Sequence, residues 1–512
     1  MKKREISLMP ILTKEIFDNC KEVFTINKDY NLNGARLIVP KGLTLKFEGG
    51  SINNGTLVVK DTLLEGTEED CINAHMEGTI RNSTIYTSVI NGIDNLYGLS
   101  LSGKTIYCDL TNDVLNNTIV LNDTNTSLTT VFDGMNNTIT CNANFFEIYG
   151  QSNIIIKNFN ASAIAGNTNL EFEKMVTTAA HVTRVQIINN TITGFKVGIS
   201  LNNDSETYTV NNCIVSGNHV YNCPGSTSGS GYGIHMANAR NCIISGNEVV
   251  NCGRHAIYHA YGENNIIINN EIKNHCIDYT TYSLWAAVEI GRKSKNVVIK
   301  GNTFQSCNNV CLLVYSPQYN QDGDGSTHLF RYGVCEGIVI EDNTFSNGTL
   351  TGVLGYLPYI YIGYEGADYS SLIQSGTYVA DVTIIRNTFT KSISDNLKCI
   401  QVNQCQRLTI AGNTFRFGLP SSPQLSQYLI IDIPANRITG YETMMTIVHN
   451  TFTYSGPGAG NVYLLGPSMS LVVAPSYVIK WFANTLNYQI IAGITRYQLY
   501  QGTAGSGLIN YD

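Results

Sequence analysis

Charged residues are scarce in this chain: they make up 14% of its 512 residues, against roughly 25% in an average soluble domain. The 32 lysines and arginines are scattered, so a surface that follows the phosphates of a nucleic acid is not expected. No apolar run reaches the roughly 18 residues that a membrane helix needs. Pro10 and Lys14 interrupt the apolar patch of the opening segment, which predicts that no signal peptide is cleaved.

Proline is also scarce, at 11 residues, whereas glycine (46) and tyrosine (30) are abundant. This composition is typical of strands joined by tight turns. The 14 cysteines include no C-x-x-C pair of the kind that holds zinc. We expect them to be reduced and to fill the core as small apolar residues.

One phrase recurs after residue 180: an apolar alternating strand, then Gly-Asn or a polar substitute, then x-Phe, x-Ile or x-Val. The phrase is constant but its spacing is not, which predicts a parallel β-helix whose loops absorb the variation. The recurrent asparagines are Asn190, Asn218, Asn247, Asn270, Asn302, Asn343, Asn387, Asn413 and Asn450.

These asparagines are predicted to occupy the left-handed position of a tight turn and to stack their amides from coil to coil. The apolar residues on either side of the turn are predicted to point inward and to form ladders. The predicted inward residues include Ile214, Ile243, Ile267, Val298 and Phe304.

Before residue 180 the phrase is degenerate. Residues 14–22 are predicted to form a short amphipathic capping helix with Thr13 as N-cap. The predicted organisation is therefore a tail and capping helix over 1–24, a solenoid over 25–455, and a β-rich capping or oligomerisation segment over 456–512.

Because of this repeat, the chain resembles right-handed parallel β-helix proteins of the pectate-lyase-like superfamily over about residues 25–455. The opening YNLNGARLIVPKGLTLKFEGGSINNGTLVV is similar to the start of β-helix tail proteins from phages of gut bacteria. The resemblance implies an all-β right-handed parallel β-helix, a carbohydrate ligand and a homotrimer. No motif of a named lyase or hydrolase family matches, so the resemblance assigns no catalytic residue.

The candidate site is the strand before the recurrent turn, where long insertions can border a groove. If its isoleucines and valines point inward, the outward row is His235, Tyr258, Glu289, Tyr361, Gln401 and Asp432.

Two chemistries fit this row. A glycosidase would use the carboxyl groups of Glu289 and Glu365, roughly 10 Å apart before side-chain reach. A lyase would use Tyr258 or His235 as base, with Arg254 or Arg292 neutralising a uronate. The structural alternative is that Glu289 only bridges to Arg292.

His255 and His259 flank Tyr258 and are interpreted as structural residues. Tyr282, Trp285 and Tyr361 suit the faces of sugar rings and suit subunit contacts equally. Asn320, Asp322 and Asp324 imitate half of a calcium loop, but Arg331 takes the place of the closing glutamate, so no metal and no cofactor are expected.

The favoured function is a tailspike-like virion protein that binds, with or without cleavage, host surface polysaccharide. It would sit in the virion tail after assembly in the host cytoplasm and contact other tail proteins through its N-terminal region. The alternatives are an extracellular bacterial polysaccharide lyase or glycoside hydrolase, and a purely structural tail component.

Overall fold

The structure, a computed structural model, describes residues 9–511 apart from 19, 67–70, 123–126, 165–173, 179–180, 203–209, 226–229, 276–285, 308, 317–332, 347–357, 364–377, 392–397, 404, 419–426, 434–442, 456–460, 468–476, 489–495 and 501–507. The chain forms two compact units. Unit 1 comprises residues 1–195 and 213–219, and unit 2 comprises residues 196–212 and 220–512.

Unit 1 begins with the short helix α1 (Lys14–Asp18), which is present but shorter than the predicted 14–22. Phe17 is fully buried and its carbonyl accepts the N–H of Cys20. Thr13 accepts the N–H of Ile16, and its side-chain hydrogen bond lowers the pKa of Glu15. The helix ends early because the chain turns to enter the first strand, β1 (Val23–Ile26).

The strands of unit 1 pair in parallel. The first sheet contains β1, β2 (Tyr30–Asn31), β3 (Arg36–Ile38), β4 (Thr44–Phe47), β5 (Ile52–Glu65) and β6 (Ile72–Ile80). Further strands stack in columns, one of which contains β7 (Thr84–Tyr86), β8 (Thr105–Tyr107), β11 (Thr130–Asp133), β14 (Ser152–Lys157) and β17 (Val182–Ile188). A second column contains β10 (Ile119–Leu121), β13 (Phe146–Ile148) and β16 (Lys174–Thr178).

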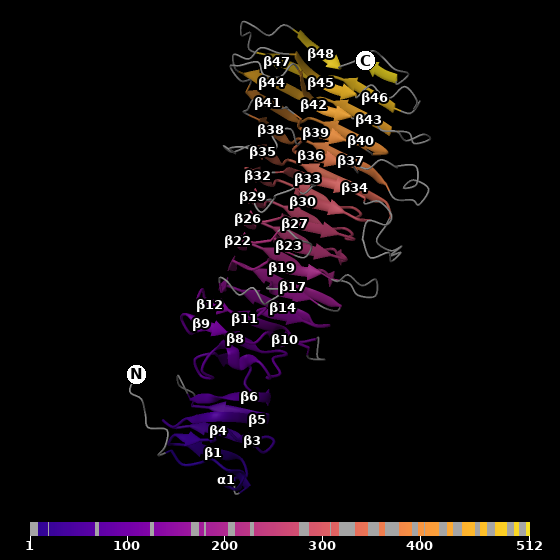
Figure 1. Ribbon diagram of the computed structural model, residues 1–512. Coiled ribbons are helices and arrows are strands. Elements are labelled where there is room, and N and C mark those ends of the chain that lie inside the picture. The colour runs from indigo at the N-terminus through magenta and orange to yellow at the C-terminus, as the bar shows by residue number, and fades with distance from the viewer. Residues whose placement is uncertain are drawn as a thin grey trace, which may run out of the picture. The chain divides into compact units, whose positions relative to one another are not determined.

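Unit 2 consists of coils, each of which adds one strand to each of three parallel sheets (Figure 1). Sheet I contains β19 (Val197–Asn202), β23 (Tyr232–Ala237), β27 (His255–Ala260), β30 (Ala286–Gly291), β33 (Val310–Tyr315), β36 (Ile360–Ile362), β39 (Ile400–Val402), β42 (Gln427–Ile433), β45 (Asn461–Pro467) and β48 (Arg496–Tyr500). Sheet II contains β25 (Ile243–Ser245), β28 (Ile266–Ile268), β31 (Val298–Lys300), β34 (Cys335–Glu341), β37 (Val379–Ile385), β40 (Arg407–Ala411), β43 (Thr443–Val448), β46 (Tyr477–Phe482) and β49 (Leu508–Tyr511). Sheet III contains β26 (Glu248–Cys252), β29 (Glu271–His275), β32 (Thr303–Gln305), β35 (Thr344–Ser346), β38 (Thr388–Lys391), β41 (Thr414–Gly418), β44 (Thr451–Ser455) and β47 (Thr485–Tyr488).

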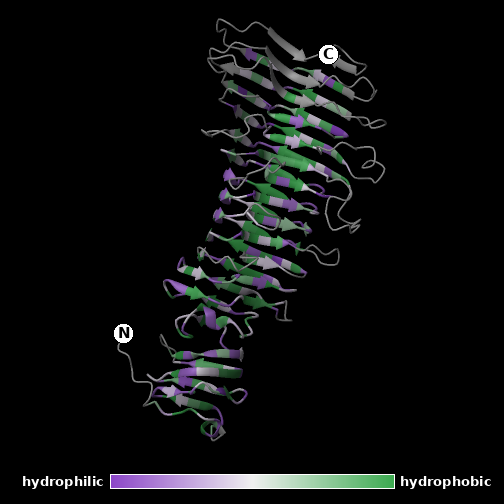
Figure 2. Ribbon diagram, in the orientation of Figure 1, coloured by the Kyte–Doolittle hydropathy of each residue, from purple (hydrophilic) through white to green (hydrophobic). Residues whose placement is uncertain are grey.

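The fold is thus the all-β right-handed parallel β-helix expected from the sequence, with the hand that parallel crossovers take. Figure 2 shows hydrophobic and hydrophilic residues interleaved along the stacked strands. This interleaving is the strand alternation from which the prediction started.

The recurrent asparagines form a buried ladder. Asn190 donates its amide to Asn218 in unit 1. In unit 2 the amide of each ladder residue donates to the side-chain oxygen of the next, at 2.9–3.0 Å. This ladder runs through Asn247, Asn270, Asn302, Asn343, Asn387, Asn413, Asn450 and Asn484.

The predicted stacking is confirmed, but the predicted backbone of the turn is wrong. The left-handed residue is the one before each ladder asparagine, for example Gly301 before Asn302 and Arg386 before Asn387. That neighbour takes the positive φ, which leaves the asparagine side chain buried and directed along the stack.

The apolar ladders are confirmed in part. Phe304 begins a buried stack with ring centroids 4.7–4.9 Å apart, and Ile267 also points inward. Ile214, Ile243 and Val298 are only half-buried, and their successors Val215, Ile244 and Ile299 fill the core instead. Those three assignments were wrong by one residue, which in a strand moves a side chain to the opposite face.

Parallel pairing continues beyond residue 455. The strands β45, β46 and β48 pair in register with the coils before them, and Asn484 extends the ladder. Residue 455, where the sequence phrase fades, is therefore not the end of the paired strands. A role of 456–512 in oligomerisation stays a prediction.

Candidate functional site

The predicted outward row lies on sheet I of unit 2. The strand registers place Ser200 beside His235, His235 beside Tyr258, and Tyr258 beside Glu289. The row continues through Leu313, Tyr361, Gln401 and Asp432. The sequence analysis identified every member of this row from His235 to Asp432 except Leu313.

Glu289 lies at the centre of the described part of this row and is only 4% exposed. Its Oε2 is 3.4 Å from Nε2 of His255, whose ring is fully buried. The other ring nitrogen of His255, Nδ1, is 2.6 Å from the carbonyl oxygen of Ala286. Since a carbonyl can only accept, Nδ1 carries a proton and Nε2 presents a lone pair to the carboxyl group.

Nε2 of His255 has no hydrogen-bond partner among the described residues, so its 3.4 Å approach to Oε2 of Glu289 is a close contact and not a hydrogen bond. Burial raises the pKa of Glu289, while Arg254, Arg292 and a hydrogen bond from Tyr315 act in the opposite direction. Burial, together with Arg254, lowers the pKa of His255 well below its usual value. The two shifts favour a neutral His255 ring and a more readily protonated Glu289, which makes Glu289 a candidate general acid.

Aromatic rings border this pair. Tyr232 and Tyr258 stack with centroids 5.4 Å apart, and His235 meets the Tyr258 ring edge-on at 5.1 Å. The guanidinium of Arg254 lies 5.5 Å from the centroid of Tyr232. Burial and then Glu289 raise the pKa of Tyr258 well above its usual value, so Tyr258 is a neutral phenol that can donate a hydrogen bond rather than a ready base.

Arg292 reaches the same region from the turn after β30, where it adopts a positive φ of 55°. Its Nη1 donates to the hydroxyl of Tyr261 at 2.7 Å. Tyr315, which packs beside Gly291, also hydrogen-bonds within this group. The row reaches solvent at His235, and Tyr315 at the end of the neighbouring strand is half-buried as well.

Tyr361 does not offer the open stacking platform that the sequence suggested. It is 1% exposed and packs with Ala286, Val310 and Leu313 in a buried cluster. Its hydroxyl bonds to the amide of Asn403. The side chain of Gln401 donates to that same asparagine at 3.0 Å. Tyr361 is therefore a buried member of the row that packs against its neighbours.

Several predicted residues lie outside the described residues. They are Tyr282, Trp285, Glu365 and the calcium-like segment 320–325. Their proposed roles stay predictions.

From the sequence, both histidines beside Tyr258 were interpreted as hydrogen-bonded structural residues, and the bond of the buried His255 ring to Ala286 agrees with this. That the same ring lies beside Glu289 was not foreseen. Tyr232 and Tyr315 were missed as well. All three are first or last residues of sheet I strands. The sequence pattern that could have identified these residues is their shared position at strand ends. Residues at such positions are brought close together by the stacking of neighbouring coils.

His259 is structural, and its hydrogen bonds fix its tautomer. Nε2 accepts from the amide of Asn265 at 2.9 Å, and Nδ1 lies 3.2 Å from the hydroxyl of Ser294. That hydroxyl donates onward to the carbonyl oxygen of Gly291, and the oxygen of the Asn265 amide accepts from the backbone of Cys242. The ring is therefore a buried neutral imidazole that links three coils.

Low pH should lower the stability of this part of unit 2. Burial lowers the pKa of His259 from 6.5 to about 4, so its contribution is complete above pH 6.5 and is lost as the pH falls towards 4. The free energy of unfolding falls by about 3 kcal/mol when this contribution is lost. Urea unfolding at pH 7 and at pH 4.5 should show a smaller pH dependence for His259→Gln than for wild type. The matched control His219→Gln, at an exposed site, should behave as wild type, and parallel curves for all three proteins would contradict this assignment.

Among the described residues, no group of three or more histidines, cysteines, aspartates or glutamates is placed to hold a metal ion. The thirteen cysteines in that part of the chain are free thiols. None of the helices described there is long and apolar enough to span a membrane.

No protein-family model matches the chain, and no curated protein sequence matches it. Solved structures similar to it include the ORF18 protein of Geobacillus virus E2, at 15% identity and a TM-score of 0.34, covering 70% of this chain. The chain spans only 51% of that protein. The A-module of the Azotobacter vinelandii mannuronan C-5 epimerase matches at 10% identity and a TM-score of 0.46, over 82% of this chain and 100% of the module. The Dettilon tailspike protein matches at 13% identity and a TM-score of 0.35, over 79% of this chain and 68% of the tailspike.

Proposed function

We propose that this chain is a tailspike-like protein of a virion tail that recognises host cell-surface polysaccharide and cleaves it at the Glu289 row. The observation that carries the proposal is the buried carboxyl group of Glu289, 3.4 Å from His255 and with its pKa raised by burial, in a row that reaches solvent at His235. A carboxyl group whose pKa is raised by burial is more readily protonated, and in its acid form it can deliver that proton to the oxygen of a glycosidic bond as it breaks.

The groups around this acid suit a sugar substrate. Arg254 and Arg292 supply positive charge, which can hold a carboxylate or another anionic group of the glycan. His235 and Tyr315 supply partly exposed rings with polar atoms, which suit a sugar ring. We further propose that Trp285, Tyr282 and Glu365 complete the groove.

The acid serves two reactions. In hydrolysis it pairs with a second carboxyl group, for which Glu365 is the proposed residue. In elimination the ring of His235 is the proposed base that removes a proton beside a uronate carboxylate neutralised by the arginines, and the Glu289 acid protonates the leaving oxygen as its bond to the sugar breaks. A bacterial lyase or hydrolase would use the same site, whereas a structural tail component would use neither reaction.

The test is to incubate the full chain with capsular polysaccharides of candidate host bacteria. New reducing ends without new ultraviolet absorbance indicate hydrolysis, and absorbance of an unsaturated uronate indicates elimination. Binding without either product would overturn the cleavage part of the proposal and leave a recognition protein. Neither binding nor cleavage for any host glycan would contradict the proposal.

We also propose a homotrimer that contacts other tail proteins through its N-terminal region. The strands after residue 455 pair with the coils before them, so truncation there would remove paired strands. The oligomeric state is therefore better measured by sedimentation of the full chain than by truncation after residue 455. A monomeric mass would contradict the trimer.

A further inference from the structure

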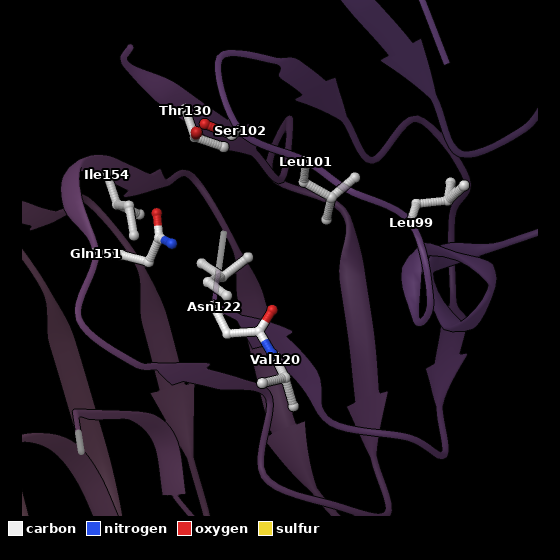
Figure 3. Close-up of a pocket in the computed structure, with 9 residues that line it drawn as sticks. Leu99, Leu101, Ser102, Val120, Asn122, Thr130, Gln151 and Ile154 are labelled. Carbon is white, nitrogen blue, oxygen red and sulfur yellow. The ribbon is translucent and has the colours of Figure 1, made fainter. Parts of the chain in front are cut away.

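The pocket of unit 1 between residues 99 and 154 is too small to hold a ligand. Its volume is about 20 Å³, which is room for roughly one or two water molecules. Such a water can accept from the buried amide of Gln151, which lines the pocket together with Thr130 and Asn122 (Figure 3). This pocket therefore marks no ligand site.

In unit 2, the ring of Tyr315 lies over Gly291. The two residues are register partners on β33 and β30. A Cβ atom added to Gly291 would lie 2.7 Å from Cε1 of Tyr315, and the three nearest heavy atoms outside the neighbouring residues all belong to that ring. This distance is much shorter than a normal carbon–carbon contact. The ring therefore occupies the space that a side chain at position 291 would fill.

This placement brings the hydroxyl of Tyr315 back towards Glu289. Glu289 and Gly291 are two residues apart on β30, so both positions face the same side of the sheet. A neighbour offset by two residues on the adjacent strand is within reach of an aromatic side chain. One hydrogen bond joins Tyr315 to Glu289, and a second joins Tyr315 to Arg292. Because a guanidinium can only donate, the hydroxyl accepts from Arg292 and donates its own proton to the carboxyl group.

Tyr315 and His255 approach the carboxyl group of Glu289 from opposite neighbouring coils. His255 belongs to β27, Tyr315 belongs to β33, and β30 lies between these two strands. Leu313, the member of the row on β33, has no polar side-chain atom. Tyr315 therefore supplies the hydrogen-bond donor from this coil, and the carboxyl group is contacted from both sides.

We propose that Tyr315 is a positioning residue for Glu289, and that the absence of a side chain at Gly291 is what admits its ring. This inference rests on the function proposed for the Glu289 row, because a positioning residue acts through the acid that it holds. A hydrogen bond donated to a carboxyl group favours its ionised form. Burial raises the pKa of Glu289, and Tyr315 acts against this rise together with Arg254 and Arg292.

The contact sets the pH range over which the acid can give up its proton, since a general acid works best when its pKa lies near the working pH. Without the hydroxyl, Glu289 would stay protonated to a higher pH. Among the described residues, the titratable and charged groups that face Glu289 are Arg254, His255, Tyr258, Arg292 and Tyr315.

Titration of Glu289 by carbon-13 NMR tests the inference in the absence of glycan. The full chain is labelled at the glutamate carboxyl carbons, and the Glu289 signal is the one that Glu289→Gln lacks. Tyr315→Phe keeps the ring and removes the hydroxyl. The titration midpoint of Glu289 should therefore rise by about one to two pH units, the scale of one hydrogen bond to a charged group.

Gly291→Ala is an independent variant that keeps the hydroxyl and displaces the ring. The φ of Gly291 lies outside the left-handed region, so alanine fits the backbone there and meets only the tyrosine. The midpoint of Glu289 should again rise, and the double variant should shift it no further than Tyr315→Phe alone. Tyr221→Phe is the matched control, because the hydroxyl of Tyr221 donates to Glu248 on sheet III. It should leave the Glu289 midpoint unchanged.

The pH profile of polysaccharide cleavage is the second measurement. Because the acid must be protonated to act, the alkaline fall in rate should move to higher pH in Tyr315→Phe by the same amount as the midpoint. Equal midpoints in wild type, Tyr315→Phe and Gly291→Ala would overturn the inference, even if the chain cleaves glycan. A shift in Tyr315→Phe alone would overturn the role of Gly291. Shifted midpoints in a chain that cleaves no glycan would contradict the proposed function and leave the contact between Tyr315 and Glu289 standing.

Discussion

Replacing Glu289 by glutamine should lower polysaccharide cleavage by roughly 100-fold to 10,000-fold, the range that general acid catalysis supplies. Glutamine has the shape of the protonated acid, and its amide can donate to Nε2 of His255, which has no hydrogen-bond partner among the described residues. The fold and glycan binding should therefore survive, and only the transferable proton should be lost.

The measurement is a comparison of initial cleavage rate and glycan affinity between wild type and Glu289→Gln. Glu263→Gln is the matched control, because Glu263 is 43% exposed in its side chain and pairs with Arg240 at the surface. It should cleave as wild type. Full cleavage by Glu289→Gln would remove the acid from the mechanism, even if the chain still binds glycan.

Replacing Asn302 by alanine should lower the free energy of unfolding by about 4 kcal/mol, since several buried groups lose a partner at about 1 to 3 kcal/mol each. The Asn302 amide donates to the carbonyl oxygen of Ile267 and to the Asn343 side chain. Its oxygen accepts both the backbone and the side-chain N–H of Asn270. Alanine leaves these groups buried without a replacement.

The measurement is the free energy of unfolding in urea, compared between Asn302→Ala and the control variant Asn487→Ala. Asn487 is an exposed residue of β47, so its replacement should change the free energy of unfolding by less than about 0.5 kcal/mol. If the two variants unfold at the same urea concentration, the ladder contributes little and the stacked rings hold the coils together.

The sequence predicted the parallel β-helix because one phrase carries three independent requirements. The turn needs a left-handed residue, the ladder needs an amide, and the core needs an apolar residue two positions later. These requirements are local, so Asn302 and Phe304 could be assigned without coordinates. The one-residue error at Ile243 arose because this residue stands four positions before its asparagine, whereas the inward position is three before it, as at Ile244 and at Ile267.

The site was less predictable for a different reason. Register along sheet I follows from the repeat, which is why His235, Tyr258 and Glu289 could be placed in one row. The contact between His255 and Glu289 depends instead on two side-chain conformations across neighbouring coils. The burial of Tyr361 likewise depends on Leu313 and Ala286, and no pattern in the chain specifies that packing.

The asparagine ladder also bears on how this chain can change over evolution. Successive ladder residues in unit 2 are 23, 32, 41, 44, 26, 37 and 34 positions apart, yet each step forms the same hydrogen bond in the same direction. Every coil thus presents a donor to one neighbour and an acceptor to the other. A whole coil can therefore be duplicated, deleted or exchanged by recombination at the turn without losing a donor–acceptor match between neighbouring coils. The surface loops can then diversify while the same asparagine hydrogen bond joins successive coils.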